Sequence, residues 1–207
     1  TQDSDIHTRV AAEVNGVEEA AVTPDMRRMA KTINFGIVYG QSPFGLARTL
    51  GISKDEAAAY IELYFARYPG VQEFMLQTLL DCRRNGFVQT MLGRRRAIQG
   101  VRDLSQLEPS KRRSLTEAER IAINTPIQGS AADLIKSAMV ALHRRLAQSQ
   151  LQAKLLLQIH DELVFEVAAD QVDDLEQLVR QEMTSVMPLR VPLKVEVGVG
   201  KTWADLK

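Results

Sequence analysis

The pattern of apolar and polar residues predicts a series of helices over the first part of the chain. Each predicted helix begins at a Ser, Thr, Asp or Pro that suits a helix N-terminus, and several are followed by a glycine that suits a helix end. Ser53-x-x-Glu56 is a capping-box pattern that opens one of them. The predicted helices cover 5–14, 23–40, 42–51, 53–67 and, after a turn at 69–70, the residues up to 85.

The middle of the chain predicts a hairpin followed by an interrupted helix. Residues 87–98 alternate weakly and pivot on Gly93, which predicts two short strands or an irregular hairpin. Ser114-x-x-Glu117 is a second capping-box pattern, and a helix is expected to follow it. Pro126 should interrupt that helix, because proline removes a backbone donor and clashes with the preceding turn. A second helix is then expected over 128–148.

The last part of the chain predicts a hairpin and a helix that covers it. Apolar runs at 154–159 and 163–167 are separated by His160-Asp161-Glu162, a pattern of strand, tight turn and strand. Asp170 is expected to cap an amphipathic helix to 187, and 193–199 is expected to form a closing strand. Helices followed by an antiparallel sheet make the predicted fold class α+β.

The composition is that of a globular protein with no overall charge. Of the 207 residues, 45% are hydrophobic and 25% are charged, and 26 basic residues balance 26 acidic ones. A nucleic-acid partner would therefore need a local basic patch, since the overall field is neutral. The single cysteine, Cys82, excludes an internal disulfide and fits a reducing compartment. No apolar run reaches the length of a membrane span, so no membrane partner is expected.

One stretch of the chain, 27–39, places charge and aromatic rings on one face of a predicted helix. Four residues spaced four apart form this helix row: Arg27, Lys31, Phe35 and Tyr39. At that spacing they project from one side of a helix over about three turns. Two cations suit a polyphosphate, and a ring beyond them suits a flat base. A solvated face over a buried apolar stripe would explain the cations alone. Because charge and rings share one row, nucleotide binding is favoured.

A basic segment follows the pivot at Gly93. Between 94 and 113 the chain carries seven basic residues against two acidic ones, a local net charge of +5. The basic residues are Arg94, Arg95, Arg96, Arg102, Lys111, Arg112 and Arg113. Such clusters are often only solvated. Three consecutive arginines at a turn are at least as well suited to phosphate contact, which holds a strand in place without reading its sequence.

Two further groups of polar residues carry candidate chemistry. Asn124 and Gln128 flank Pro126, and their amides can donate to the minor-groove acceptors that all base pairs share; taken alone, they could also be capping residues.

Asp161 and Glu162 lie at a hairpin tip that lacks the Gly or Asn preferred in two-residue turns. Many acidic tips have no function, but two carboxylates on a rigid hairpin offer hard oxygen ligands to Mg²⁺.

The helix row and three later motifs resemble those of family-A DNA polymerases, the bacterial DNA polymerase I group. The pattern Arg27-x-x-Ala30-Lys31-x-x-x-Phe35-Gly36-x-x-Tyr39, with Ser42 and Leu46 following, is similar to the family's nucleotide-binding motif. The later motifs are GRRR at 93–96, NTPIQG at 124–129 and QIHDELVFE at 158–166. The motifs are long, follow the family's order and cover nearly the whole chain, which makes the resemblance specific.

The resemblance implies a helical fingers subdomain over 1–112 and the C-terminal part of a palm subdomain over 113–207, whose antiparallel sheet carries the acidic hairpin. It implies template-directed DNA synthesis by a DNA-directed DNA polymerase, a nucleotidyltransferase. A primer 3′-hydroxyl would attack a deoxynucleoside triphosphate (dNTP), with two Mg²⁺ ions stabilising the attacking and leaving oxygens. The implied partners are primer–template DNA and dNTP. The implied setting is DNA replication and repair in the bacterial cytoplasm, at the nucleoid.

The resemblance also assigns roles to individual residues. Nucleotide-binding residues would be Arg27, Lys31, Phe35, Tyr39 and His7. Lys31 would also be a candidate proton donor to pyrophosphate, and Phe35 would discriminate against dideoxynucleotides. DNA-binding residues would be Arg94, Arg95, Arg96, Arg120, Asn124, Gln128 and His160. Asp161 and Glu162 would be the catalytic, metal-binding carboxylates, with Glu162 either a ligand or a neighbour of the bound ion.

One motif of that family has no counterpart in this sequence. The family's first metal-binding aspartate lies within Asp-Tyr-Ser-Gln-Ile-Glu, upstream of the His7 region, and no such run occurs here. The first residue is Thr1 and not Met. We therefore expect a fragment that needs the upstream part of the same polymerase, with the thumb and the first catalytic motif. The alternatives are a non-catalytic DNA-binding module derived from a polymerase and, disfavoured by the joint motifs, a nucleotide-binding enzyme of another kind.

Overall fold

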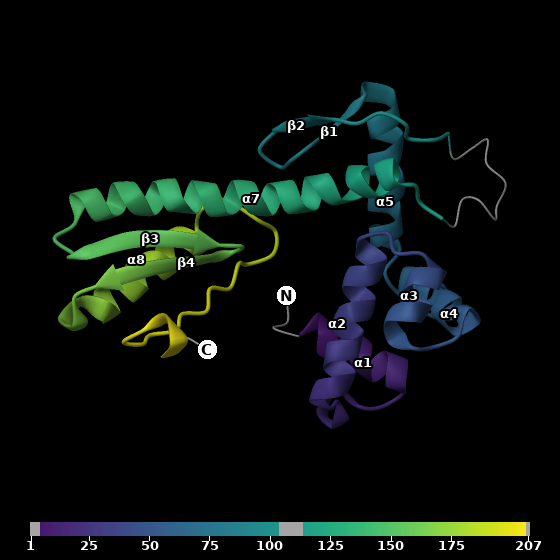
Figure 1. Cartoon of the computed structure of the whole chain (residues 1–207), viewed down its shortest axis with the longest axis horizontal. Helices are drawn as coiled ribbons and strands as arrows, with labels where there is room; N and C mark the ends of the chain where they lie inside the picture. Colours follow the sequence, from purple (N-terminus) through teal and green to yellow (C-terminus); the bar gives the residue numbers. More distant parts are fainter. Residues whose placement is uncertain (1–4, 104–113, 206–207) are drawn as a thin grey trace. The chain divides into compact units, whose positions relative to one another are not determined.

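The computed structural model describes residues 5–103 and 114–205, which form helices and two small antiparallel sheets (Figure 1). The α+β fold class expected from the sequence is confirmed. The chain divides into two compact units, Thr1–Ile127 and Gln128–Lys207. The assignment of 1–112 to fingers and 113–207 to palm stays a prediction.

The first unit is mostly helical. It contains α1 (Ile6–Asn15), η1 (Glu19–Ala21), α2 (Pro24–Val38), α3 (Pro43–Leu50), α4 (Lys54–Arg67), α5 (Pro69–Asn85), β1 (Phe87–Gln89), β2 (Arg95–Ala97) and the beginning of α7 (Glu117–Gln148). The four helix starts expected from the sequence are confirmed, because each capping side chain accepts a hydrogen bond from a backbone N–H of the first turn. These caps are Asp5, Thr23, Ser42 and Ser53, and Ser53 forms the predicted capping box with Glu56.

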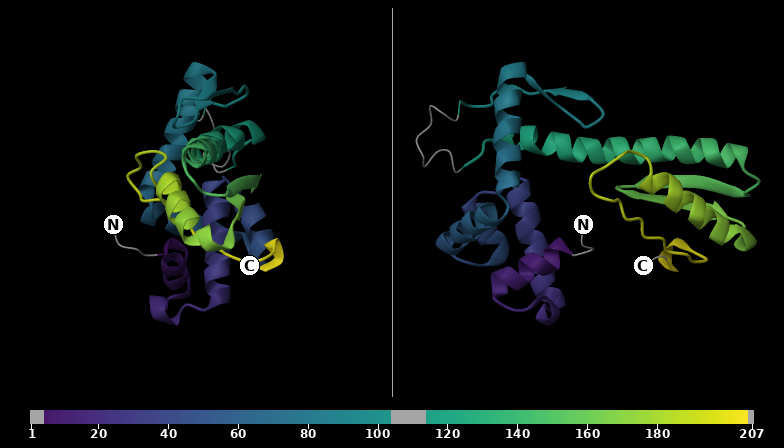
Figure 2. Two further views of the ribbon diagram at one scale, coloured as in Figure 1. Left: turned by 90° about the vertical axis from the view of Figure 1, so that its left-hand side faces the viewer. Right: turned by 180° about the vertical axis from the view of Figure 1, so that it is seen from behind.

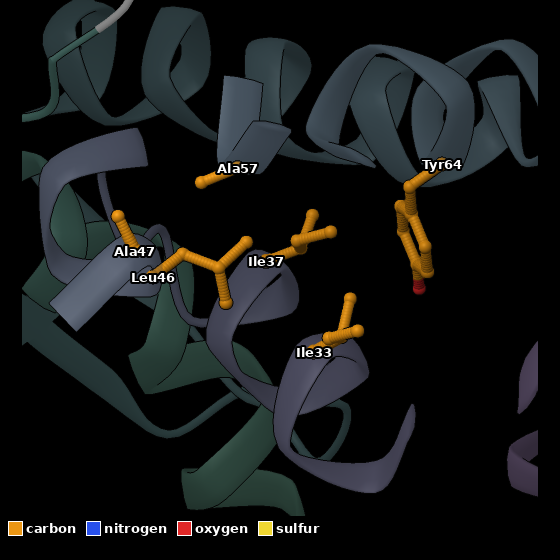
Figure 3. Packing of buried hydrophobic residues seen from close by; sticks show 6 residues of the cluster. All are labelled: Ile33, Ile37, Leu46, Ala47, Ala57 and Tyr64. Atoms are coloured by element: carbon orange, nitrogen blue, oxygen red, sulfur yellow. The ribbon is translucent and has the colours of Figure 1, made fainter. Parts of the chain in front are cut away.

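The core that supports the helix row lies between α2, α3 and α4. Ile33 and Ile37 project from α2 toward Leu46 of α3 and Ala57 of α4, and Tyr64 of α4 closes one side (Figure 3). Each of these side chains is buried. Their burial fixes which face of α2 points outward, and that face carries the row.

Two helix starts differ from the prediction. Pro69 and Gly70 form the first turn of α5 and not a turn before it, because proline suits the first helical position, where no backbone donor is needed. The capping box of α7 is Thr116-x-x-Glu119, two residues later than predicted: Thr116 Oγ1 accepts from the Glu119 N–H, and Glu119 accepts from the Thr116 N–H. Glu119 is fully buried, so its tertiary contacts select this pair over the one at 114 and 117.

The predicted interruption at Pro126 is wrong, because α7 runs unbroken from Glu117 to Gln148 with Pro126 inside it. Proline there removes one backbone hydrogen bond and weakens the turn before it, at a cost of about 3 kcal/mol. The Thr125 hydroxyl donates to the Ile121 carbonyl at 2.7 Å in the turn that precedes the proline. Among the described helices, α7 included, none is long and apolar enough to cross a membrane.

The second unit is a hairpin covered by helices. After the rest of α7 come β3 (Ala153–Ile159), β4 (Glu162–Val167), η3 (Ala169–Gln171), α8 (Val172–Thr184) and η4 (Trp203–Asp205). The predicted hairpin is confirmed, with Ile159 paired to Glu162 and a register shift between Leu155 and Leu157. Figure 2 shows α8 alongside the hairpin from two sides, where Leu142 of α7 packs with Leu175 of α8 and with apolar residues of both strands.

The end of the second unit differs from the prediction in two ways. Asp170 lies in η3, so it does not cap α8, and α8 ends at Thr184, before 187. The segment 193–199 is not a strand. A strand needs a neighbouring strand for its ladder of hydrogen bonds, and the sheet of β3 and β4 has only those two strands among the described residues. The segment is instead attached through the Val195 carbonyl, which accepts from Arg180 of α8.

Candidate functional site

The helix row lies together on the outer face of α2, as the four-residue spacing predicts. Lys31 Nζ lies 5.9 Å from the centre of the Phe35 ring. The Phe35 and Tyr39 rings stack with centroids 5.8 Å apart and planes inclined by 14°. Arg27, Lys31 and Phe35 are exposed, and Tyr39, which caps the helix, is half-buried. Two cations and two stacked rings therefore form one continuous accessible surface.

His7 of α1 joins this surface from the side. Its ring centroid lies 5.6 Å from that of Phe35. Burial lowers the pKa of His7 below its ordinary value, the positive charges of Arg27 and Lys31 lower it further, and Asp5 acts in the opposite direction. The five residues expected to bind nucleotide thus lie together, although their role in binding stays a prediction.

Asp5 has a second role that the sequence did not reveal. Besides capping α1 through the His7 N–H, its carboxylate forms an ion pair with Arg27 Nε and accepts from the Thr8 hydroxyl. Burial raises the pKa of the Asp5 carboxyl, but these hydrogen bonds outweigh it and lower the pKa from 3.8 to about 2. Asp5 is therefore an anion at neutral pH and orients the first cation of the row.

Asn34 is another residue whose role the sequence pattern did not predict. It lies in the middle of α2 with 5% of its surface exposed, and its Nδ2 lies 2.9 Å from His7 Nδ1. The sequence does carry a signal for this residue, because an asparagine next to Ile33 interrupts the apolar stripe of a helix.

The hairpin of β1 and β2 presents the three arginines that follow Gly93. Arg95 and Arg96 are neighbours on a strand, so their side chains point to opposite sides. The Arg95 guanidinium lies 4.6 Å from the centre of the Phe87 ring, and Arg96 Nη1 donates to Thr125 Oγ1 of α7 at 3.2 Å. All three arginines are exposed.

The rest of the predicted basic segment is not a uniform patch. Arg102 forms a two-pronged ion pair with the buried Glu119: its Nη2 lies 2.6 Å from Glu119 Oε2, and its Nε donates to Glu119 Oε1 at 2.8 Å. Its Nη2 also donates to the Ser114 carbonyl. Burial raises the pKa of Glu119, but the hydrogen bonds from Arg102 and the Thr116 backbone outweigh it and lower the pKa. Arg102 is therefore a structural residue. Lys111, Arg112 and Arg113 lie outside the described residues.

The candidate residues of α7 follow one another at four-residue spacing. Arg120 is exposed and donates to the Leu115 carbonyl at 3.2 Å. Asn124 is half-buried, and within the described part of the chain its buried Oδ1 has no hydrogen-bond partner. Gln128 begins the second unit and is exposed. With no interruption at Pro126, the capping alternative for Asn124 and Gln128 is excluded.

The acidic tip of the second hairpin is strained. His160 has φ of +52°, the left-handed region that glycine and asparagine favour, and Gln158 Nε2 donates to its carbonyl at 2.8 Å. Asp161 completes the turn and Glu162 begins β4, and both carboxylates are exposed. Within the described residues, no group of three or more His, Cys, Asp or Glu side chains could hold a metal ion. The tip therefore offers a carboxylate pair and not a complete metal site.

Comparison with known proteins gives one consistent result. Residues 1–205 match the family model described as DNA polymerase family A. DNA polymerase I of Bacillus caldotenax is 48% identical over 206 residues, covering 100% of this chain and 23% of the relative. The thermostable DNA polymerase I of Thermus filiformis is 49% identical over 204 residues, covering 98% and 23%. This chain thus spans roughly a quarter of the length of these curated relatives.

A solved structure agrees with the sequence relatives. The POL domain of Pol1 from M. smegmatis, in complex with DNA primer–template and dNTP, superposes with a TM-score of 0.86 at 41% identity. The match covers 98% of this chain and 35% of that one. Together with the family match, this likeness shows that the chain belongs to DNA polymerase family A.

Proposed function

We propose that this chain binds the incoming nucleotide and part of the primer–template in a DNA-directed DNA polymerase. The observation that carries the proposal is the accessible surface of α2, where Arg27, Lys31, Phe35 and Tyr39 lie in one row beside His7. Cations followed by stacked rings match a dNTP, in which a triphosphate is joined through a sugar to a base. The primer–template and dNTP bound by the M. smegmatis relative support this interpretation.

Each residue of the row has a role in the proposed reaction. Arg27 and Lys31 neutralise the triphosphate, which lowers the barrier as charge moves onto the leaving pyrophosphate. In this proposal Lys31 also gives that group a proton. Phe35 packs against the sugar, and Tyr39, stacked on Phe35, borders the base pair. His7 adds a hydrogen bond to the phosphates from α1.

The carboxylates of Asp161 and Glu162 fit Mg²⁺, because they are exposed, adjacent and of the ligand type that this ion prefers. When bound, Mg²⁺ stabilises the attacking 3′-hydroxyl oxygen and the leaving oxygen of a phosphoryl transfer. Two ions need more oxygen ligands than this tip supplies. We propose that an upstream part of the same polymerase supplies the other carboxylate motif.

Primer–template contacts come from two places in this proposal. Arg94, Arg95 and Arg96 contact phosphates, which gives affinity that depends on salt and not on sequence. Arg120, Asn124 and Gln128 of α7 contact the minor groove of the nascent pair, where their side-chain N–H groups donate to the acceptors that all base pairs share. His160 contacts the primer end beside the carboxylates.

The test is primer extension by a chimera in which this chain replaces the matching region of the B. caldotenax polymerase. The chimera should extend a primed template with Mg²⁺ and all four dNTPs. The chain alone should bind primed DNA weakly, with strong salt dependence, and extend nothing. A chimera that binds primed DNA but does not extend it would support the alternative of a non-catalytic DNA-binding module.

A further inference from the structure

Asn34 is a costly residue at its position. It is 5% exposed in the middle of α2, where asparagine forms a helix less readily than leucine and buries a polar amide. Within the described part of the chain its Oδ1 is buried without a hydrogen-bond partner. Only its Nδ2 is used, at 2.9 Å from His7 Nδ1. A buried amide retained for one hydrogen bond suggests that this bond matters to function.

That bond determines the state of the His7 ring. An amide NH₂ group can only donate, so His7 Nδ1 must accept, and the single proton of a neutral imidazole must then lie on Nε2. Within the described residues no other hydrogen bond is made by the ring, so Nε2–H is available to a ligand. A proton on Nδ1 would leave two donors facing each other, so the contact also opposes the imidazolium.

Burial is the largest influence on the pKa of His7 and favours the neutral ring, while the charged groups around the ring act in both directions. Arg27 and Lys31 face it from α2 and favour the neutral ring, whereas Asp5, which caps α1, favours the charged one. Asp5 is itself paired with Arg27, which limits its effect on the ring. Phe35, the other neighbour, carries no charge. His7 is therefore neutral near pH 7, with a pKa below the ordinary 6.5.

We infer that Asn34 is a positioning residue: by donating to His7 Nδ1, it fixes His7 as a neutral donor whose Nε2–H meets the triphosphate of an incoming nucleotide. The triphosphate end of this inference rests on the proposed function, whereas the fixed tautomer does not. The contrasting interpretation is that Asn34 only links α1 to α2. In that case removing the Asn34 amide would weaken nucleotide binding equally whether or not residue 7 is a histidine.

The first experiment reads the tautomer of the chain without ligand. The sequence has three histidines, His7, His143 and His160, so long-range ¹H–¹⁵N spectra would contain three imidazoles. At pH 8 the His7 ring should show a protonated Nε2 and an unprotonated Nδ1. In Asn34→Leu it should become a mixture of tautomers, while the rings of His143 and His160 stay unchanged. A wild-type His7 that carries its proton on Nδ1 would overturn the inference without any variant.

The second experiment uses dATP with Mg²⁺ as the probe and isothermal titration calorimetry as the readout. At pH 8 Asn34→Leu should weaken dATP binding by roughly twofold, because the apparent affinity falls in proportion to the fraction of His7 rings that still carry the proton on Nε2. The same change in a His7→Gln background should have almost no effect, since an amide has no tautomer to fix. Equal losses in both backgrounds would show that Asn34 is only structural.

A variant that does not fold and a chain that binds no dATP can each be told apart from a failure of the inference. If Asn34→Leu does not fold, Asn34→Asp replaces it: its carboxylate accepts from Nδ1–H, so the pKa of His7 should rise above that of the wild type, and an unchanged His7 titration would refute the inference. If wild-type chain with the expected tautomer binds no dATP, the proposed function fails while the fixed tautomer stands.

Discussion

The two hairpins of this chain solve the same backbone problem with different residues. The β1–β2 hairpin turns at Gly93, whose φ is +81°, and the β3–β4 hairpin turns at His160, whose φ is +52°. A side chain in the left-handed region costs about 1 kcal/mol, whereas glycine has no such cost. A Cβ at Gly93 would meet nothing within 4 Å, so that glycine serves the backbone and not a crowded space.

The difference separates a turn whose residue type turn geometry explains from one whose residue type it does not explain. In the first hairpin the residue type at the turn follows from turn geometry, because glycine adopts the left-handed backbone of Gly93 without strain. In the second, a strained residue stands directly before the carboxylates proposed to bind Mg²⁺. Strain of this kind persists where surrounding structure holds it and function gains from it.

The largest expected effect distinguishes the two tips. In the chimera, Asp161→Ala should reduce primer extension about a thousandfold or more, because it removes a proposed metal ligand, while affinity for primed DNA changes little. Met91→Ala, at the exposed tip of the other hairpin, is the matched control and should leave extension intact. Extension rates and filter binding, measured with Mg²⁺, give both readouts. Substantial extension by the Asp161 variant would refute the metal assignment.

The next effect concerns how the segment after β2 is held to α7. Glu119→Gln should destabilise the first unit by about 3 kcal/mol, because the buried partner of Arg102 loses its charge. The exposed Glu117→Gln is the control. Since the folded-state pKa of Glu119 lies below the ordinary 4.5, its contribution is fully present above that pH and declines as the pH falls through the folded value.

Urea unfolding measures this effect. The difference between wild type and Glu119→Gln should therefore be large at pH 7 and shrink as the pH drops well below 4.5. A difference that stays constant over that range would mean that the charge of Glu119 has no part in the stability of the unit.

A smaller effect is expected at the helix row, where a change should alter selectivity and not abolish the reaction. Phe35→Tyr should keep extension but raise dideoxynucleotide incorporation by roughly tenfold, because the added hydroxyl can replace the interaction of a missing 3′-hydroxyl. Competition between deoxy- and dideoxynucleotides in the chimera measures the ratio. Tyr39→Phe adds no hydroxyl and should leave selectivity unchanged. An unaltered ratio in Phe35→Tyr would place the ring away from the sugar.

Local signals were enough to predict much of this fold. Asp5, Thr23, Ser42 and Ser53 cap helices because the reason for each cap lies within four residues of it. The four-residue spacing of the helix row likewise depends only on helix geometry.

The missed features depend on residues far apart in the sequence. Thr116 caps α7 because Glu119 is drawn into a buried pair with Arg102, 17 residues away. Asn34 matters because His7 lies beside it, 27 residues away. The segment 193–199 alternates like a strand, but its alternation cannot tell whether a partner strand exists. Periodicity and capping signals therefore cannot report such contacts.

The smallest expected effect tests the comparison of the hairpins directly. His160→Gly should stabilise the second unit by about 1 kcal/mol, because glycine adopts the left-handed backbone freely, whereas Gly93→Ala should destabilise the first unit by a similar amount. His160→Ala keeps the Cβ and should leave stability nearly unchanged, so it isolates the loss of the ring. Urea unfolding of each variant gives the signs. In the chimera, both His160 variants should extend primers more slowly than the wild type, because the proposed contact to the primer end is lost. If His160→Gly gained no stability, the turn would be unstrained, and the histidine would need no functional explanation.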